Sequence, residues 1–170
     1  MASISHHPGL LLLVGVALSL ACQSSSVAGA LAVAASSAGL LDLSGACWVI
    51  YGANLGSGFN FALLAKAHQG EAAQIALMQA AQKLAGFAVA MLLVGIEQLS
   101  GRPLIESTIA SLSSSLTAQV AWVFLLYQVA GSAVCTVFVG PILAVLERVA
   151  PPSKLQEMSK PAYLIEDALV

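Results

Sequence analysis

The sequence predicts an all-α integral membrane protein. Of its 170 residues, 59% are hydrophobic and only 8% are charged, and the mean hydropathy is +0.92. A soluble domain carries about 25% charged residues. The apolar segments 72–97 and 117–149 are each long enough to cross a hydrocarbon core of about 30 Å as helices. We therefore expect a membrane domain over 1–150, followed by a charged tail over 151–170. The net charge of −2 gives no indication of a nucleic-acid-binding surface.

The first membrane element, 9–41, is an apolar stretch interrupted by Gln23-Ser24-Ser25-Ser26. Its apolar parts are each too short for a comfortable crossing, which favours a re-entrant helical hairpin with the polar tip at mid-depth. Irregular backbone at that depth is tolerated only where protein or water surrounds it. The alternative is one long helix whose serines bond back to carbonyls one turn earlier.

The second element, 43–68, contains Gly52-Ala53-Asn54-Leu55-Gly56-Ser57-Gly58. Three glycines and an asparagine within seven residues predict a broken membrane helix, because these residues readily adopt non-helical backbone angles. Alternatively, Gly52 and Gly56 form a face that packs closely on another helix.

The distribution of lysine and arginine predicts the orientation of the chain. If the hairpin returns to its own side, the loop 97–115 with Arg102 lies on one side of the membrane. The basic residues on the opposite side are Lys66, Arg148, Lys154 and Lys160. The positive-inside rule then places the C-terminal tail in the cytoplasm. The several predicted membrane segments make this a multi-pass protein of the cell membrane.

The three cysteines, Cys22, Cys47 and Cys135, lie far apart in apolar segments and have no neighbours at metal-ligand spacing. We expect them to be buried apolar side chains and expect no metal site.

The polar interruptions suit the transport of ions better than catalysis. Sodium prefers oxygen ligands, and the candidate ligands are the side chains of Gln23, Ser24, Ser25, Ser26, Asn54 and Ser57, together with freed backbone carbonyls. A half-helix that begins after the serines would direct its free N–H groups toward an anion. The two interruptions together predict cation-coupled transport of an anion, with sodium as coupling ion and no cofactor. The membrane segments hold no catalytic arrangement of carboxylates or of Ser and His, so we do not expect an enzyme.

Gln23-Ser24-Ser25-Ser26 followed by Gly52-Ala53-Asn54-Leu55-Gly56-Ser57 resembles the QSSS and GANIGTT pair of the sodium/phosphate symporter family. The tail sequence Lys160-Pro161-Ala162-Tyr163-Leu164 is similar to the stretch where bacterial members leave the membrane before a PhoU-like domain. The resemblance implies sodium-coupled transport of inorganic phosphate. It also implies that the six candidate ligands named above bind sodium and phosphate.

Transporters of that family are built from two inverted repeats, and this chain resembles only the second, without the PhoU-like domain. The resemblance therefore implies a half-transporter whose site needs a partner membrane chain carrying the first repeat. A second, oppositely inserted copy of the chain is disfavoured by the charge bias. The alternatives are a non-transporting membrane assembly or regulatory subunit, and an inactive truncated remnant of the family.

The chain departs from the family pattern at several positions. The second threonine of GANIGTT is Gly58, so one hydroxyl is lost. Where family members show Phe-Asn within a His-x-x-Phe-Asn pattern, the two long segments have Gln82-Lys83 and Tyr127-Gln128. A lysine in mid-span either faces the bundle, paired with a carbonyl or glutamine, or has a function. As a functional residue, Lys83 would contact the anion or would replace a bound sodium as a fixed positive charge.

The two long segments also contain a short stretch of similar sequence. Lys83-Leu84-Ala85-Gly86 and Gln128-Val129-Ala130-Gly131 each place a polar residue three positions before a glycine.

Overall fold

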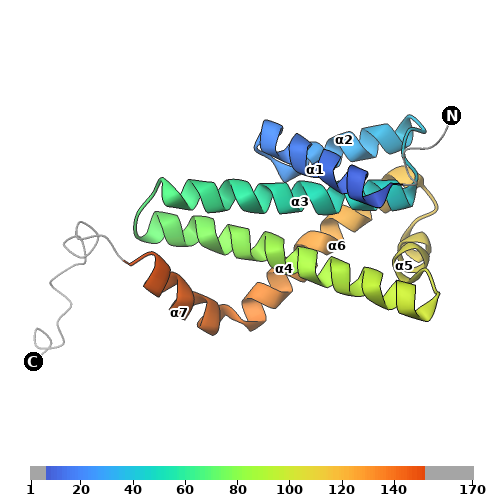
Figure 1. The fold of residues 1–170 in the computed structure, drawn as a ribbon. Coiled ribbons are helices and arrows are strands. Elements are labelled where there is room, and N and C mark those ends of the chain that lie inside the picture. Colours follow the sequence, from blue (N-terminus) through green and yellow to red (C-terminus); the bar gives the residue numbers. More distant parts are fainter. Residues whose placement is uncertain (1–6, 152–170) are drawn as a thin grey trace, which may run out of the picture.

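The computed structural model of the chain describes residues 7–151, and every regular element within them is a helix (Figure 1). The helices are α1 (Pro8–Cys22), α2 (Ser25–Ser37), α3 (Leu43–Lys66), α4 (Glu71–Ser100), α5 (Leu104–Leu112), α6 (Leu116–Val137) and α7 (Val139–Val149). The prediction of an all-α fold is confirmed. The predicted tail 151–170 lies, apart from its first residue, outside the described residues.

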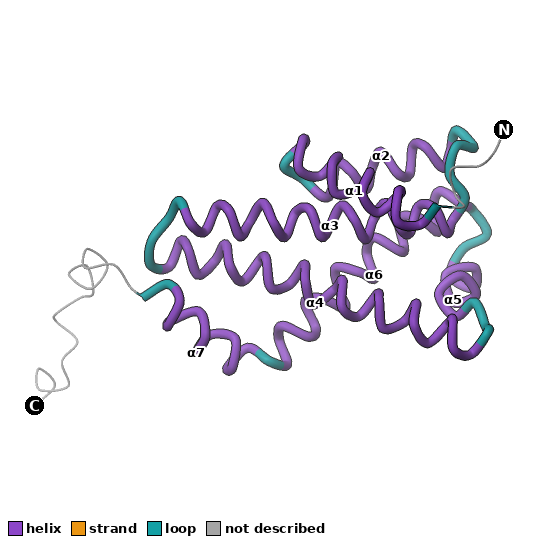
Figure 2. The backbone as a smooth tube through the Cα atoms, viewed as in Figure 1, coloured by secondary structure: helices purple, strands orange, loops and turns teal. Residues whose placement is uncertain are grey.

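Helices α1 and α2 form a hairpin whose turn lies at Gln23 and Ser24 (Figure 2). Gln23 adopts the left-handed conformation, with φ of 51°, and ends α1. Ser24 is extended, and its hydroxyl accepts a hydrogen bond from the Val27 amide at 3.3 Å. This is the geometry of a helix N-cap. The chain therefore reverses at the predicted tip, and one continuous helix over this stretch is wrong.

The two ends of the hairpin lie at the same end of the helical bundle (Figure 1). At a rise of about 1.5 Å per residue, α1 is about 22 Å long and α2 about 20 Å, so each is shorter than a hydrocarbon core of about 30 Å. These lengths agree with a hairpin that enters a membrane part-way, and that placement in the membrane stays a prediction.

Helix α3 runs without interruption from Leu43 to Lys66, so the predicted broken helix over 43–68 is wrong. The alternative prediction, that Gly52 and Gly56 form a face that packs closely on another helix, is confirmed. A Cβ atom on Gly52 would overlap the carbonyl oxygen of Leu12, and one on Gly56 would lie 2.8 Å from the carbonyl oxygen of Val16. The glycines therefore let the backbones of α1 and α3 touch, as small residues do in membrane helix pairs.

Helices α4 and α6 are the two helices in the described part that are long and apolar enough to cross a membrane, by length and composition. The predicted helix 72–97 extends to Glu71 and Ser100. The predicted single helix 117–149 is wrong, because it divides at Phe138 into α6 and α7. Pro141 lies in the first turn of α7, where it cannot donate the hydrogen bond that would continue α6. The predicted loop 97–115 contains α5.

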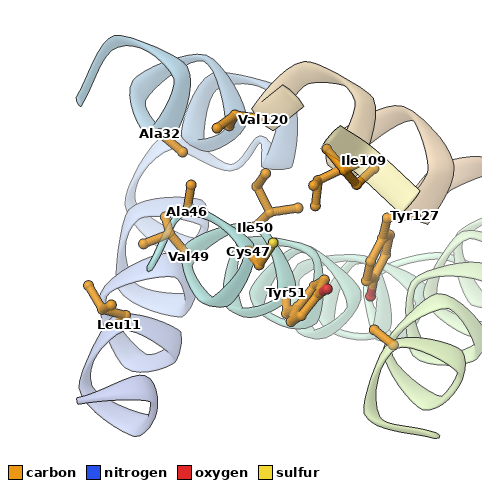
Figure 3. Packing of buried hydrophobic residues seen from close by; sticks show 12 residues of the cluster. Leu11, Ala32, Ala46, Cys47, Val49, Ile50, Tyr51, Ile109, Val120 and Tyr127 are labelled. Atoms are coloured by element: carbon orange, nitrogen blue, oxygen red, sulfur yellow. The ribbon is translucent and has the colours of Figure 1, made fainter. Parts of the chain in front are cut away.

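The apolar core gathers around the first half of α3. Ile50 is fully buried, and Figure 3 shows it among side chains from other helices, including Val120 of α6 and Ile109 of α5. The ring of Tyr51 stacks on that of Tyr127, with 6.1 Å between the ring centroids. This core holds α3 against α6.

The cysteines follow the prediction in two of three cases. Cys47 and Cys135 are buried, whereas Cys22 is exposed beside the hairpin turn. The expectation of a buried Cys22 is wrong because the helix ends there and the chain reverses.

Lys66 and the end of α7 lie at the same end of the bundle, where Lys66, His68 and Ala150 line a cavity of about 630 Å³. Arg102 lies at the turn between α4 and α5, at the opposite end (Figure 1). The described basic residues are thus distributed as the orientation argument assumed. The side of the membrane that each end faces stays a prediction.

Candidate functional site

Four helices bring polar side chains together inside the bundle. The polar cluster consists of Ser25 of α2, Asn54 of α3, Lys83 of α4 and Gln128 of α6. The Lys83 ammonium donates to Ser25 Oγ at 3.3 Å, to Asn54 Oδ1 at 3.1 Å and to Gln128 Oε1 at 2.8 Å. Ser25, Asn54 and Lys83 are buried. The ammonium has three donors, and all three are used on protein oxygens.

Three members of the polar cluster lie near the middle of their helices, whereas Ser25 is the first residue of α2. At about 1.5 Å per residue, Asn54 lies about 17 Å from the start of α3, while Lys83 and Gln128 each lie about 18 Å from the start of their helices. In a hydrocarbon core of about 30 Å, such positions are close to mid-depth. Polar groups at this depth are costly without partners, and they commonly mark functional sites.

The amide of Asn54 is held in one orientation. Its Nδ2 donates to the Ile50 carbonyl one turn earlier at 2.9 Å, which leaves Oδ1 to accept from Gln128 Nε2 and from Lys83. Asn54 is completely buried. Its oxygen is therefore a fixed acceptor at the centre of the polar cluster.

The two similar segments, 83–86 of α4 and 128–131 of α6, pack directly on one another. A Cβ atom on Gly131 would lie 2.5 Å from the Gln82 carbonyl oxygen, and one on Gly86 would lie 2.7 Å from the Tyr127 ring. The Tyr127 hydroxyl donates to the Lys83 carbonyl at 2.7 Å. The glycines thus bring the two backbones close enough for Lys83 to reach Gln128.

The predicted site residues divide into two groups. Ser25, Asn54 and Lys83 meet in the polar cluster, and Ser57 is buried on α3. The others lie at the hairpin turn, where the Ser24 hydroxyl caps α2 and the side chains of Gln23 and Ser26 are exposed. The structure places the second group at the surface beside Ser25.

Gln128 is a member of the polar cluster that the sequence did not identify as a site residue. Two features of the sequence could have indicated it. Gln128 stands where the resemblance expects the asparagine of the Phe-Asn pair, and it occupies the same position in segment 128–131 as Lys83 does in segment 83–86. Its significance depends on the packing of α6 against α4, which periodicity alone does not show.

Lys83 faces the bundle and pairs with a glutamine, as its structural interpretation predicted. A contact with an anion and the replacement of a sodium ion both stay predictions. In this geometry the ammonium has no unused donor for an anion.

The chain matches a protein-family model. The sequence model described as Na+/Pi-cotransporter matches residues 1–112, which contain α1 to α5. Neither the curated proteins nor the solved structures give a match. The family match covers 112 of the 170 residues and includes the hairpin, α3 and Lys83. Together with two apolar helices of membrane-spanning length, it identifies a membrane protein of a transport family, and the chain belongs to the Na+/Pi-cotransporter family.

Proposed function

We propose that the chain is one half of a sodium-coupled phosphate transporter and that a second membrane chain, carrying the first repeat, completes its site. The observation that carries this proposal is the polar cluster, which joins the tip of the hairpin to three helices near their mid-length. A chain of this transporter family with such a cluster has a place for ions within the membrane.

The need for a partner is supported by the exposed polar residues at the hairpin turn. Gln23 and Ser26 lie within two residues of the buried Ser25, yet both are exposed. Polar side chains facing hydrocarbon lose hydrogen bonds to water, at a cost of several kcal/mol per unsatisfied group. A partner repeat that covers this surface removes that cost and supplies the remaining ligands.

In the proposed complete site, sodium and phosphate bind to Gln23, Ser24, Ser25, Ser26, Asn54 and Ser57 and to their counterparts in the partner. The N-terminus of α2 suits the anion, because free backbone amides and the helix dipole favour negative charge there. In the described structure the Ser24 hydroxyl already accepts a hydrogen bond from the Val27 amide. An incoming phosphate oxygen would take the place of that hydroxyl.

The proposed arrangement in the membrane follows from the two ends of the bundle. The hairpin is re-entrant, α3, α4 and α6 cross, and the end that carries Lys66 and Arg148 faces the cytoplasm. The C-terminal tail then follows into the cytoplasm.

The proposal is tested by uptake of radiolabelled phosphate into proteoliposomes. The chain is reconstituted alone and together with the product of the neighbouring upstream reading frame, in sodium chloride and in choline chloride. We expect uptake only with the partner and only in sodium. Ser25→Ala should abolish it, whereas Ser111→Ala on α5, outside the polar cluster, should not. Absence of phosphate uptake in every combination would contradict the proposal.

A second candidate is a non-transporting regulatory or assembly subunit. The observation that favours it is the full use of the Lys83 donors, which gives a closed network inside the chain. This function predicts that Gln23→Ala and Ser25→Ala leave the cellular role unchanged. Loss of phosphate uptake in a partnered Ser25→Ala variant that still assembles would exclude it.

A further inference from the structure

The Lys83 ammonium is surrounded as a bound metal cation would be. Its three hydrogen-bond partners are a hydroxyl oxygen from α2 and amide oxygens from α3 and α6, at 2.8 to 3.3 Å. All three are neutral oxygens from separate helices. Neutral hydroxyl and amide oxygens are suitable ligands for a hard monovalent cation.

No carboxylate balances the charge of Lys83 within the described residues. The carboxylates of that part of the chain belong to Asp42, Glu71, Glu97, Glu106 and Glu147, toward the ends of helices or on the short α5, and none pairs with Lys83. A buried charge without a paired ion requires good hydrogen bonds instead. The neutral oxygens therefore stabilise the ammonium by their dipoles alone, as they would stabilise an ion.

Two of the three oxygen ligands, the amide oxygens of Asn54 and Gln128, are held in place independently of Lys83. Asn54 is oriented by the Ile50 carbonyl, and Gln128 is oriented by its Nε2 hydrogen bond to Asn54. Removal of the ammonium would leave both amide oxygens directed into the same space. A preformed set of this kind favours occupation by another cation.

Gly58 leaves room for the side chain of Lys83 because it has no Cβ atom. A Cβ atom at this position would lie only 3.3 Å from Lys83 Cβ, which would be a tight contact. The Tyr127 hydroxyl fixes the backbone of Lys83 through its carbonyl oxygen. Gly58 on one side and Tyr127 on the other thus define where the lysine enters the polar cluster.

We propose that the Lys83 ammonium permanently occupies one monovalent-cation site, formed by Ser25, Asn54 and Gln128, so that no sodium ion binds between these three side chains. Any sodium ion of the proposed transport site is then held by the other candidate ligands and by the partner chain. The consequence for transport rests on the proposed function, because one fixed charge would replace one sodium ion in each transport cycle. The occupation of the site itself does not depend on transport and is tested by binding alone.

The test measures sodium binding to the full-length chain purified in detergent. Thermal unfolding is followed at increasing sodium chloride, with ionic strength held constant by choline chloride, for the wild type, Lys83→Ala and Lys83→Ser. Lys66→Ala, at the exposed end of α3, is the matched lysine control. A ligand that binds only the folded state raises the melting temperature with its concentration.

We expect no sodium-specific shift for the wild type or Lys66→Ala. Both Lys83 variants should melt lower than the wild type in choline and should recover stability with sodium, saturably. They should also retain radioactive sodium several-fold above the wild-type level, and Asn54→Ala in the Lys83→Ala background should abolish that retention.

The proposal is overturned if neither Lys83 variant, when folded, responds to sodium. If neither Lys83 variant folds in sodium chloride or in choline chloride, the thermal unfolding of the wild type tests the proposal instead. Sodium-specific stabilisation of the wild type that is lost in Ser25→Ala would overturn the proposal, and its absence would support it. A failure of phosphate uptake would leave these binding results unchanged, so the two proposals fail separately.

Discussion

The ammonium nitrogen of Lys83 lies 2.8 Å from the amide oxygen of Gln128, and this contact joins α4 and α6, the two candidate membrane-spanning helices of the described residues, near mid-length. By the resemblance described above, these two positions take the place of the asparagines of the His-x-x-Phe-Asn pattern. The departures are therefore a matched pair. A lysine on one helix is accommodated by a glutamine on the other.

Removing the partner of this lysine should destabilise the fold. Gln128→Leu leaves one N–H group of a buried ammonium without an acceptor, and a hydrogen bond to a charged group contributes about 1.5–3 kcal/mol. We expect the melting temperature in detergent to fall. Gln82→Leu is the control, since Gln82 bonds Ser132 at an exposed position at 2.7 Å. Equal melting temperatures for the two variants would contradict the importance of the Lys83 contact.

Adding a single methyl group to Gly52 should separate α1 from α3. In Gly52→Ala the new Cβ atom overlaps the Leu12 carbonyl oxygen, and overpacking of this kind costs about 1–3 kcal/mol. In Gly95→Ala, within α4, the new Cβ atom meets nothing within 4 Å. The control should therefore keep or slightly raise stability, because alanine is the better helix former. Comparable thermal unfolding of both variants would show that the helices do not touch at Gly52.

The start of α3 depends on Asp42, whose Oδ1 accepts a hydrogen bond from the Gly45 amide at 2.8 Å. Asp42→Ala removes this N-cap and should lower the free energy of unfolding by about 0.5–2 kcal/mol. Asp42→Asn keeps a side-chain acceptor and should retain most of the stability. Hydrogen exchange of the first turn of α3 measures the effect locally. Unchanged exchange in Asp42→Ala would argue against the cap.

The depth of the hairpin turn can be measured through Cys22. It is exposed beside the turn, whereas Cys47 and Cys135 are buried. A thiol-reactive fluorophore should therefore label Cys22 selectively, and Cys22→Ser should abolish the labelling. We expect nitroxides placed deep in the acyl chains to quench the fluorophore more strongly than nitroxides at the head groups. The reverse order would place the turn at the membrane surface and contradict a re-entrant hairpin.

Local chemistry was sufficient to predict part of the fold. The chain reversal at Gln23 and Ser24 was predictable because consecutive polar residues divide an apolar stretch into parts too short to span. The long helix over 72–97 was predictable from its length and composition.

The continuity of α3 was not predictable in the same way. The glycines from Gly52 to Gly58 are compatible with either an unwound segment or a packing face, and the choice depends on α1, whose backbone occupies the space left by Gly52 and Gly56. The division at Phe138 had a local signal, Gly140-Pro141, but continuous hydrophobicity across 117–149 outweighed it. Gln128 was missed as a site residue because its role arises from contacts with helices distant in sequence.

The backbone contact between α1 and α3 has a mechanical consequence. Gly15 faces the Val49 carbonyl, as Gly52 faces that of Leu12, so the two helices interlock through main-chain atoms rather than through flexible side chains. A shift of one residue along the contact would drive a larger side chain into a carbonyl oxygen. Helices α1 and α3 are therefore fixed in register, and Ser25 follows α1 directly, at the start of α2 after the hairpin turn. Helices α4 and α6 make a main-chain contact of the same kind, because the missing Cβ of Gly131 leaves room for the Gln82 carbonyl oxygen. The polar cluster is therefore held between two interlocked helix pairs.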